Sequence, residues 1–317
     1  MPAYFVTVRS ISGNAFTGSV GPPRYLEVPD DADTPLPSHA VSYKTWLNGV
    51  LATFARDQRG DLRGDLLCYV HGFNEDAKGV AQGHRLIDAG LKGREFRCTV
   101  ISFDWPSAGT AFAYVEDTDS AKLTAVSFVK SCVRPLLAAQ SPTCKVAVHA
   151  LCHSMGAYVL REALDHADDG QSADTTWTLN QVALIGADVD AQDFVDGNAD
   201  TESLLRHCYR LTNYFNLYDE VLQISNAKRL GVAPRLGRVG LPPDAPTKTV
   251  NVDCSKHYAG LPDPGGGPIA EASRSHGWYF QDAGFMADLA NALMGSVDRT
   301  VVPGRAPVAD SRTMALS

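Results

Sequence analysis

The stretch Lys145–Leu164, KVAVHALCHSMGAYVLREAL, joins an apolar run to a helical pattern at a single serine, Ser154. The residues before the serine are typical of a buried strand, and residues 155–167 repeat apolar side chains at helical spacing. A strand that turns directly into a helix exposes a serine at its apex as a nucleophile, usually within the signature G-x-S-x-G. Here Cys152 replaces the first glycine and Gly156 supplies the second. The simpler reading is that the serine caps the helix.

The composition is that of an ordinary globular protein. The 317 residues are 44% hydrophobic and 20% charged, which favours one large domain with a substantial core. A formal net charge of -8 lacks the basic excess needed to bind phosphate backbones, so we expect no nucleic-acid partner. The first residues, MPAYFVTVRS, do not resemble a signal peptide, and no apolar run is long enough to span a bilayer. We therefore expect a cytoplasmic protein without stable membrane association, whose cysteines are buried free thiols. Its oligomeric state is left open.

Strand-like and helix-like segments alternate along the chain, which predicts an α/β fold with a mostly parallel central sheet covered by helices on both faces. We expect one domain over residues 1–295 and a flexible C-terminal tail over 296–317. The stretches 226–248 and GLPDPGGGPIA before His276 are interpreted as mobile surface loops. The expected strands begin near residues 3, 65, 97, 145, 181, 209 and 248, and the expected helices span 78–92, 118–139, 155–167 and 283–295.

Ligands of such sheets bind beyond the carboxyl ends of the strands, where this chain carries HGFN, FDWPSAG, HSMG, GADVD and NLYDE. Gly72 permits a sharp turn that aims the Phe73 amide at Ser154. Together with the Met155 amide at the helix start, this amide would form an oxyanion hole. His71 is assigned a structural role.

The remaining polar and aromatic residues at these strand ends receive lesser roles. Asn74, Asp104 and Trp105 are expected to shape the substrate pocket. His153 is adjacent to the serine in sequence, and we expect its side chain to point elsewhere. The cluster of His149, Cys152 and His153 is not interpreted as a metal site, because a strand directs His149 and Cys152 to opposite faces.

Six segments, taken in order, are VHGFN (70–74), FDWPSAG (103–109), HSMG (153–156), GADVD (186–190), YDEVLQIS (218–225) and SHGWYF (275–280). Their content and order resemble the α/β-hydrolase superfamily. More narrowly, they are similar to a bacterial branch of esterase-like and lipase-like proteins of largely unassigned function. The resemblance covers about residues 65–295. It implies the α/β-hydrolase fold and a serine-dependent hydrolase.

The resemblance also implies a base and an acid that follow Ser154 in the order serine, acid, histidine. His276 matches the late motif of the branch, and His257 is the alternative base. The acid is carried over to Asp219, with Asp188 at the preceding strand end as the alternative. Asp219 also has a structural reading as the cap of the following helix.

These assignments predict a serine hydrolase that cleaves small-molecule carboxylic esters through an acyl-enzyme, with no metal and no organic cofactor. An amidase, thioesterase or acyltransferase with the same residues is an alternative. So is a binding protein on a hydrolase scaffold, which the missing glycine at Cys152 suggests. A short connection after GADVD disfavours a lid and long-chain lipase behaviour. The basic residues from Lys228 to Arg238 would favour anionic substrates, unless they form a solvated surface.

Overall fold

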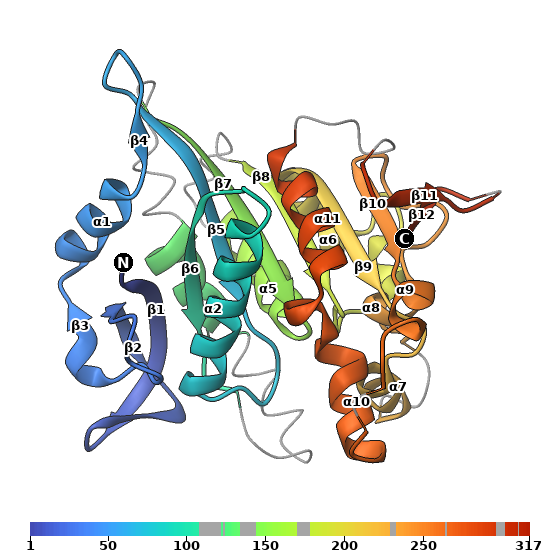
Figure 1. Ribbon diagram of the computed structural model, residues 1–317, viewed down its shortest axis with the longest axis horizontal. Coiled ribbons are helices and arrows are strands. Elements are labelled where there is room, and N and C mark those ends of the chain that lie inside the picture. Colours follow the sequence, from blue (N-terminus) through green and yellow to red (C-terminus); the bar gives the residue numbers. More distant parts are fainter. Residues whose placement is uncertain are drawn as a thin grey trace.

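The computed structural model describes residues 1–107, 122, 124–133, 144–169, 178–228, 233–263, 265–295, 302–309 and 311–317. Its centre is one twisted sheet (Figure 1) in the order β11-β12-β10-β9-β8-β7-β5-β6-β1-β2-β3, with β4 beside β5. Every neighbouring pair from β12 to β1 is parallel, and antiparallel pairs occur at the edges and at β4. The mostly parallel sheet predicted from the sequence is confirmed. The strands are β1 (Ala3–Ser12), β2 (Ala15–Val28), β3 (Ala40–Val41), β4 (Ala55–Arg56), β5 (Leu62–Val70), β6 (Cys98–Asp104), β7 (Cys144–His153), β8 (Leu179–Ile185), β9 (Cys208–Phe215), β10 (Thr249–Asp253), β11 (Arg305–Pro307) and β12 (Thr313–Leu316).

Helices cover both faces of this sheet because its strands are apolar on both sides. One core contains Trp46 of α1, the apolar side of α5 and Leu204 of α6, and the other contains Ile87 of α2 and Phe285 of α11. In Figure 1, α2 and α11 lie in front of the sheet. The α-helices are α1 (Tyr43–Ala52), α2 (Ala77–Lys92), α5 (Gly156–Asp169), α6 (Ala199–Arg206), α7 (Glu220–Lys228), α8 (Leu236–Val239), α9 (Ser255–Ala259), α10 (Pro268–Gly277) and α11 (Ala283–Met294).

Helix α5 crosses the sheet at van der Waals distance. A Cβ atom added at Gly156 would lie 2.2 Å from the backbone oxygen of Val70 and 2.8 Å from that of His71. No side chain fits there, so the structure requires glycine at this position of the motif. Cys152, at the place of the first glycine, is fully buried on β7 beside Val70 of β5.

The C-terminal segment differs from the predicted flexible tail. Strand β12 pairs with β10 in parallel, β11 pairs with β12, and Met314 and Leu316 are buried. Arg305 forms a buried ion pair with Asp288 of α11, at 2.5 Å. The prediction failed because the strands are too short to show periodicity, although their burial and this ion pair join them to the domain.

Other expected elements need smaller corrections. The helix expected over 118–139 is described only at residue 122 and over 124–133, where it is helical. The stretch 226–248 was expected to be a loop but contains the end of α7 and the short helix α8. GLPDPGGGPIA was also expected to be a loop, but α10 begins within it at Pro268, and His276 lies in its last turn.

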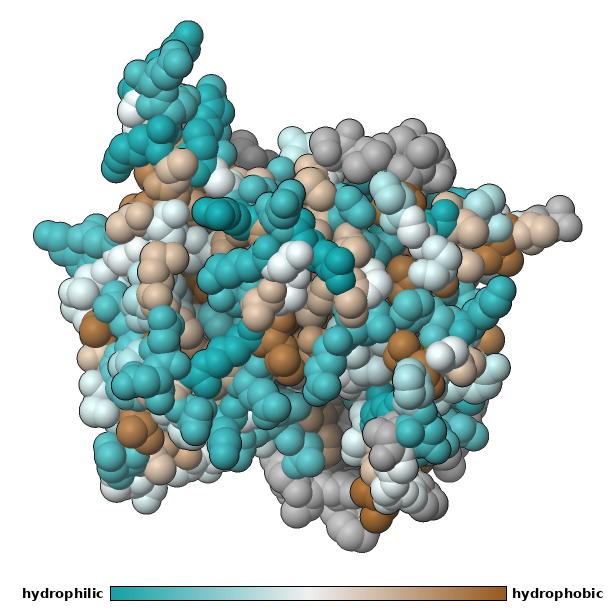
Figure 2. Space-filling view, in the orientation of Figure 1, coloured by the Kyte–Doolittle hydropathy of each residue, from teal (hydrophilic) through white to brown (hydrophobic). Residues whose placement is uncertain are grey.

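The face seen in Figure 2 is mainly polar, with separate small hydrophobic areas. None of the helices in the described ranges combines the length and the apolar composition that a membrane crossing requires.

Candidate active site

Ser154 occupies the strained turn that the sequence predicts between β7 and α5. Its φ angle is 52°, in the left-handed region that non-glycine residues rarely adopt. Neighbouring backbone holds it there, because its N–H donates to the Ile185 oxygen at 3.1 Å and its oxygen accepts from the Ala157 and Asp188 amides at 3.1 Å. Strain that is fixed in this way is typical of functional turns.

His276 and Asp219 meet at the same edge of the sheet. Nδ1 of His276 lies 2.7 Å from Oδ2 of Asp219, and both residues are buried. The second carboxylate oxygen of Asp219, Oδ1, accepts from the Leu222 amide at 2.9 Å in the first turn of α7. Asp219 therefore caps a helix, as the structural interpretation of it predicts, and it also pairs with His276, while its role as a catalytic acid stays a prediction.

The alternative acid and base are engaged elsewhere. Asp188 accepts from the Ser225 hydroxyl at 2.9 Å and lies 3.6 Å from the guanidinium of Arg235. His257 contacts Asp282, the N-cap residue of α11, with 3.0 Å between Nε2 and Oδ1. In the described ranges, Asp188 and His257 therefore do not form a pair with each other.

Gly186 lies between the serine turn and the His276–Asp219 pair. It follows Ile185, whose oxygen accepts from Ser154, and a Cβ atom added at Gly186 would lie 3.2 Å from Cε1 of His276 and 3.5 Å from Oδ2 of Asp219. Within the described ranges, no hydrogen bond joins the Ser154 hydroxyl to His276, and Nε2 of His276 has no partner. In unliganded sites such bonds are often long and shorten when substrate binds.

His153 was expected to point away from the site, and this expectation is wrong. Nε2 of His153 lies 3.1 Å from the His276 backbone oxygen, and the two rings lie 4.6 Å apart. Burial, and then the positive charge of His276, hold the pKa of His153 well below its usual value. A neutral His153 that donates to this oxygen fixes the backbone of His276.

The charges around His276 favour its protonated form. Burial alone would lower the pKa of His276, but the charge and the hydrogen bond of Asp219 raise it above the usual value of 6.5. Asp188 and Glu75 add to this effect. At this site the aspartate therefore stabilises an imidazolium.

The turn after β5 packs directly on the serine. A Cβ atom added at Gly72 would lie 2.7 Å from the Ser154 Cβ, so only glycine permits this approach. Asn74 closes the turn with a φ of 59° and is exposed at its rim. The two amides predicted to form the oxyanion hole lie on either side of this contact. The Met155 amide, at the start of α5, has no acceptor among the described residues, and Phe73 follows Gly72 in the turn.

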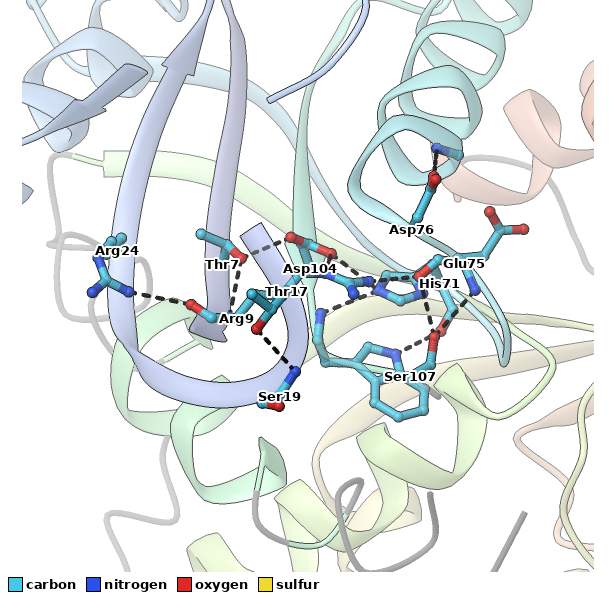
Figure 3. Close-up of polar contacts among 12 residues, drawn as sticks. Thr7, Arg9, Thr17, Ser19, Arg24, His71, Glu75, Asp76, Asp104 and Ser107 are labelled. Carbon is cyan, nitrogen blue, oxygen red and sulfur yellow. Dashed lines mark hydrogen bonds and ion pairs between the residues drawn. The ribbon is translucent and has the colours of Figure 1, made fainter. Parts of the chain in front are cut away.

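Asp104 and Trp105 contact this turn at His71, and Figure 3 shows Asp104 beside His71. Both are buried, and the Trp105 indole donates to the His71 oxygen at 2.9 Å while its backbone N–H donates to Nε2 of His71 at 3.1 Å. Nδ1 of His71 lies 2.8 Å from the Gly72 oxygen, so both ring nitrogens are used and the structural role predicted for His71 is confirmed. Because Asp104 and Trp105 are buried, their contacts in the structure are with the turn at His71, and their expected role in shaping the substrate pocket stays a prediction.

Sequence reasoning missed Thr7 and Arg9 of β1, which bind Asp104. The Thr7 hydroxyl donates to Oδ2 at 2.7 Å and Nε of Arg9 donates to Oδ1 at 2.6 Å. Burial alone would raise the pKa of Asp104, but the charge of Arg9 and the contact with His71 lower it below its usual value. The available signal was a lone arginine two residues after a threonine in an apolar strand, since both then face the same side.

The α/β-hydrolase class is defined by a mostly parallel sheet with helices on both faces, a serine at a strand–helix turn and a later aspartate–histidine pair. Here the aspartate follows β9 and the histidine lies in the last turn of α10. The chain belongs to the family described as "Alpha/beta hydrolase of unknown function (DUF900)", whose profile matches residues 44–251. The matched region includes Ser154 and Asp219 and ends before His276. No metal-binding group of three or more His, Cys, Asp or Glu residues occurs in the described ranges.

Several solved structures are similar to this chain at low identity, and no curated protein matches it. A cutinase-like protein from Cryptococcus sp. has 16% sequence identity and a TM-score of 0.37, covering 74% of this chain and 97% of that chain. Phospholipase PlaB from Legionella pneumophila has 13% identity and a TM-score of 0.31, covering 50% and 40%. An extracellular alpha/beta-hydrolase from Paenibacillus species has 14% identity and a TM-score of 0.25, covering 61% and 73%.

Proposed function

We propose that this protein is a serine hydrolase that cleaves carboxylic esters, with Ser154 as nucleophile, His276 as general base and Asp219 as the acid that orients the histidine. The observation that carries the proposal is the 2.7 Å His276–Asp219 pair beside a serine held at a φ of 52°. A serine hydroxyl needs a base, and a base needs a fixed tautomer, so these residue types complement one another.

The reaction begins when Nε2 of His276 takes the Ser154 proton as Oγ attacks the ester carbonyl. The Asp219 carboxylate stabilises the imidazolium, which agrees with the raised pKa of His276. The new oxyanion accepts from the Phe73 and Met155 amides, whose turns are in contact through Gly72 and the serine.

The tetrahedral intermediate then expels the alcohol, which takes its proton from His276, and the acyl group stays on Ser154. Water attacks this acyl-enzyme with the same histidine as base, and the carboxylic acid leaves. This sequence balances without a metal or a redox partner.

A matched substrate panel tests the proposal and separates it from its alternatives. Wild type and Ser154→Ala are each incubated with p-nitrophenyl acetate, butyrate and longer esters, a corresponding anilide and a thioester, and the rate of hydrolysis is measured. We expect turnover of short esters, much slower anilide cleavage and no turnover by the variant. Preferred thioester or amide cleavage would reassign the substrate class, and equal rates for the two proteins would exclude Ser154 as nucleophile.

A further inference from the structure

Arg9 is an almost fully buried arginine on β1, outside the segment that matches the family profile. Strand β1 lies beside β6, with Thr7 opposite Asp104 at the end that carries the site. The register between β1 and β2 shifts on both sides of Arg9. Such bulges redirect a side chain, and they are common beside active sites.

The guanidinium of Arg9 joins two parts of the site framework (Figure 3). Nε donates to Oδ1 of Asp104 at 2.6 Å, and the second arm donates to the Glu75 backbone oxygen at 2.6 Å. Thr7 occupies the other oxygen of Asp104. One buried cation therefore ties the end of β6 to the end of the turn that follows β5.

The same turn, residues 71–75, is also held by Trp105 at its first residue and by Ser107 at its last. Trp105, which follows Asp104, donates twice to His71, where the turn begins. The Ser107 hydroxyl lies between the amide and the oxygen of Glu75, at 3.1 and 3.2 Å. Residues 71–75 are thus held at both ends, and Gly72 in their middle touches Ser154.

We propose that Arg9 is a positioning residue that sets the place of the Phe73 amide relative to Ser154. Donors to an oxyanion act only within a few tenths of an ångström of their working distance. If the turn were free to shift, the rate of the chemical step would fall while substrate binding would stay the same. An arginine is required because its planar fork reaches two acceptors at once, which a lysine ammonium cannot reproduce with the same geometry. This inference rests on the serine hydrolase proposed above.

Arg305 provides a matched control. Its guanidinium and the Asp288 carboxylate form another buried ion pair, and Arg305 lies on β11, at the other end of the strand order from β1. If buried arginines of this protein act only through stability, Arg9→Lys and Arg305→Lys will lower the melting temperature and leave kcat unchanged.

The experiment measures kcat and KM for p-nitrophenyl acetate, melting temperature, and inhibition by a small alkylboronic acid, whose serine adduct mimics the tetrahedral oxyanion. We expect Arg9→Lys to lower kcat about tenfold or more. The upper limit is the effect of losing a whole oxyanion donor, which lowers kcat about 10²–10³-fold. KM should stay within about threefold and boronic acid affinity should fall with kcat, because only interactions made in the transition state are lost. Arg305→Lys should leave all three kinetic values near wild type.

Two further variants distinguish a loss of positioning from a loss of folding. Ser107→Ala removes the second contact to Glu75 without leaving a buried charge, and we expect a smaller fall in kcat with unchanged KM. Arg9→Ala should regain part of its kcat when millimolar guanidinium fills the space. Equal kcat for Arg9→Lys, Ser107→Ala, Arg305→Lys and wild type would overturn the inference while Ser154-dependent turnover stands. Absence of that turnover in wild type would instead overturn the proposed function, and this inference with it.

Discussion

Two histidines near Ser154 each lie beside a buried aspartate, and they differ in what their second nitrogen does. His276 has Nδ1 on Asp219 at 2.7 Å, and Nε2 has no partner among the described residues. His71 lies 3.5 Å from Asp104, but Trp105 donates to its Nε2 and its Nδ1 meets a backbone oxygen. Proximity to a carboxylate does not by itself indicate a base.

Further pairs support this lesson. The contacts of His257 with Asp282, His149 with Asp65 and His207 with Asp168 measure 3.0, 3.1 and 2.7 Å. The first pair joins α9 to the start of α11, the second joins β7 to β5, and the third joins the end of α6 to α5. Among the described residues, His276 is the one histidine that combines an aspartate partner, a strained serine turn nearby and a second ring nitrogen without a partner. These two features, the available nitrogen and the nearby serine, are the reason why we propose a catalytic role for the His276–Asp219 pair and not for the others.

The largest contrast is expected between Asp219→Asn and Asp104→Asn. Asp219→Asn should lower kcat by about 10⁴-fold, because the amide favours the wrong tautomer of His276 and cannot stabilise the imidazolium. Asp104→Asn should cost about 3–5 kcal/mol of stability, because it leaves Arg9 buried without its counter-charge. It should lower kcat far less than Asp219→Asn, about tenfold, because it loosens the turn that Arg9 holds. Steady-state kinetics and urea unfolding measure the two effects, and a larger kcat loss in Asp104→Asn would reverse the assignment of the pairs.

A smaller contrast concerns the first residue of the serine motif. Cys152→Leu adds volume to a filled space under α5 and should destabilise the fold by about 1–3 kcal/mol and lower kcat by shifting the turn. Cys152→Gly restores the usual motif, and we expect it to keep most of the activity. Equal activity in both variants would show that the helix does not depend on close packing here.

The pH dependence of kcat/KM distinguishes the His276–Asp219 pair from the His257–Asp282 pair and requires no substitution of Ser154. His276 must be neutral to accept a proton and its pKa is raised, so kcat/KM should fall as pH drops through a value above the ordinary 6.5. His257→Gln, which breaks a pair outside the site, should leave this acid limb in place. A rate that stays flat down to about pH 4 would contradict the role of His276.

The smallest expected effect is that of His257→Gln itself. It removes one hydrogen bond to the capping residue of α11 and should cost about 1 kcal/mol of stability, with kcat changed less than about threefold. A large kcat loss would restore His257 as a candidate base.

The parts predicted from sequence are those that local patterns encode. The strand ends with their HGFN, HSMG and GADVD segments follow from short apolar runs, and the resemblance suggested His276 and Asp219, which the fold brings together. Arg9 was not found, because its partner Asp104 is 95 residues away and the local signal, its spacing from Thr7, does not indicate which residue it contacts. The C-terminal strands were missed because pairing with β10 determines them, and His153 was misplaced because the turn at Ser154 ends the alternation of the strand.

The most direct test is covalent labelling of the protein with a fluorophosphonate, followed by intact mass and peptide mapping. The account predicts one adduct per chain on Ser154, no adduct in Ser154→Ala, and labelling slowed by orders of magnitude in Asp219→Asn and His276→Ala. A wild-type protein that does not react, or that carries its adduct on another residue, would contradict it.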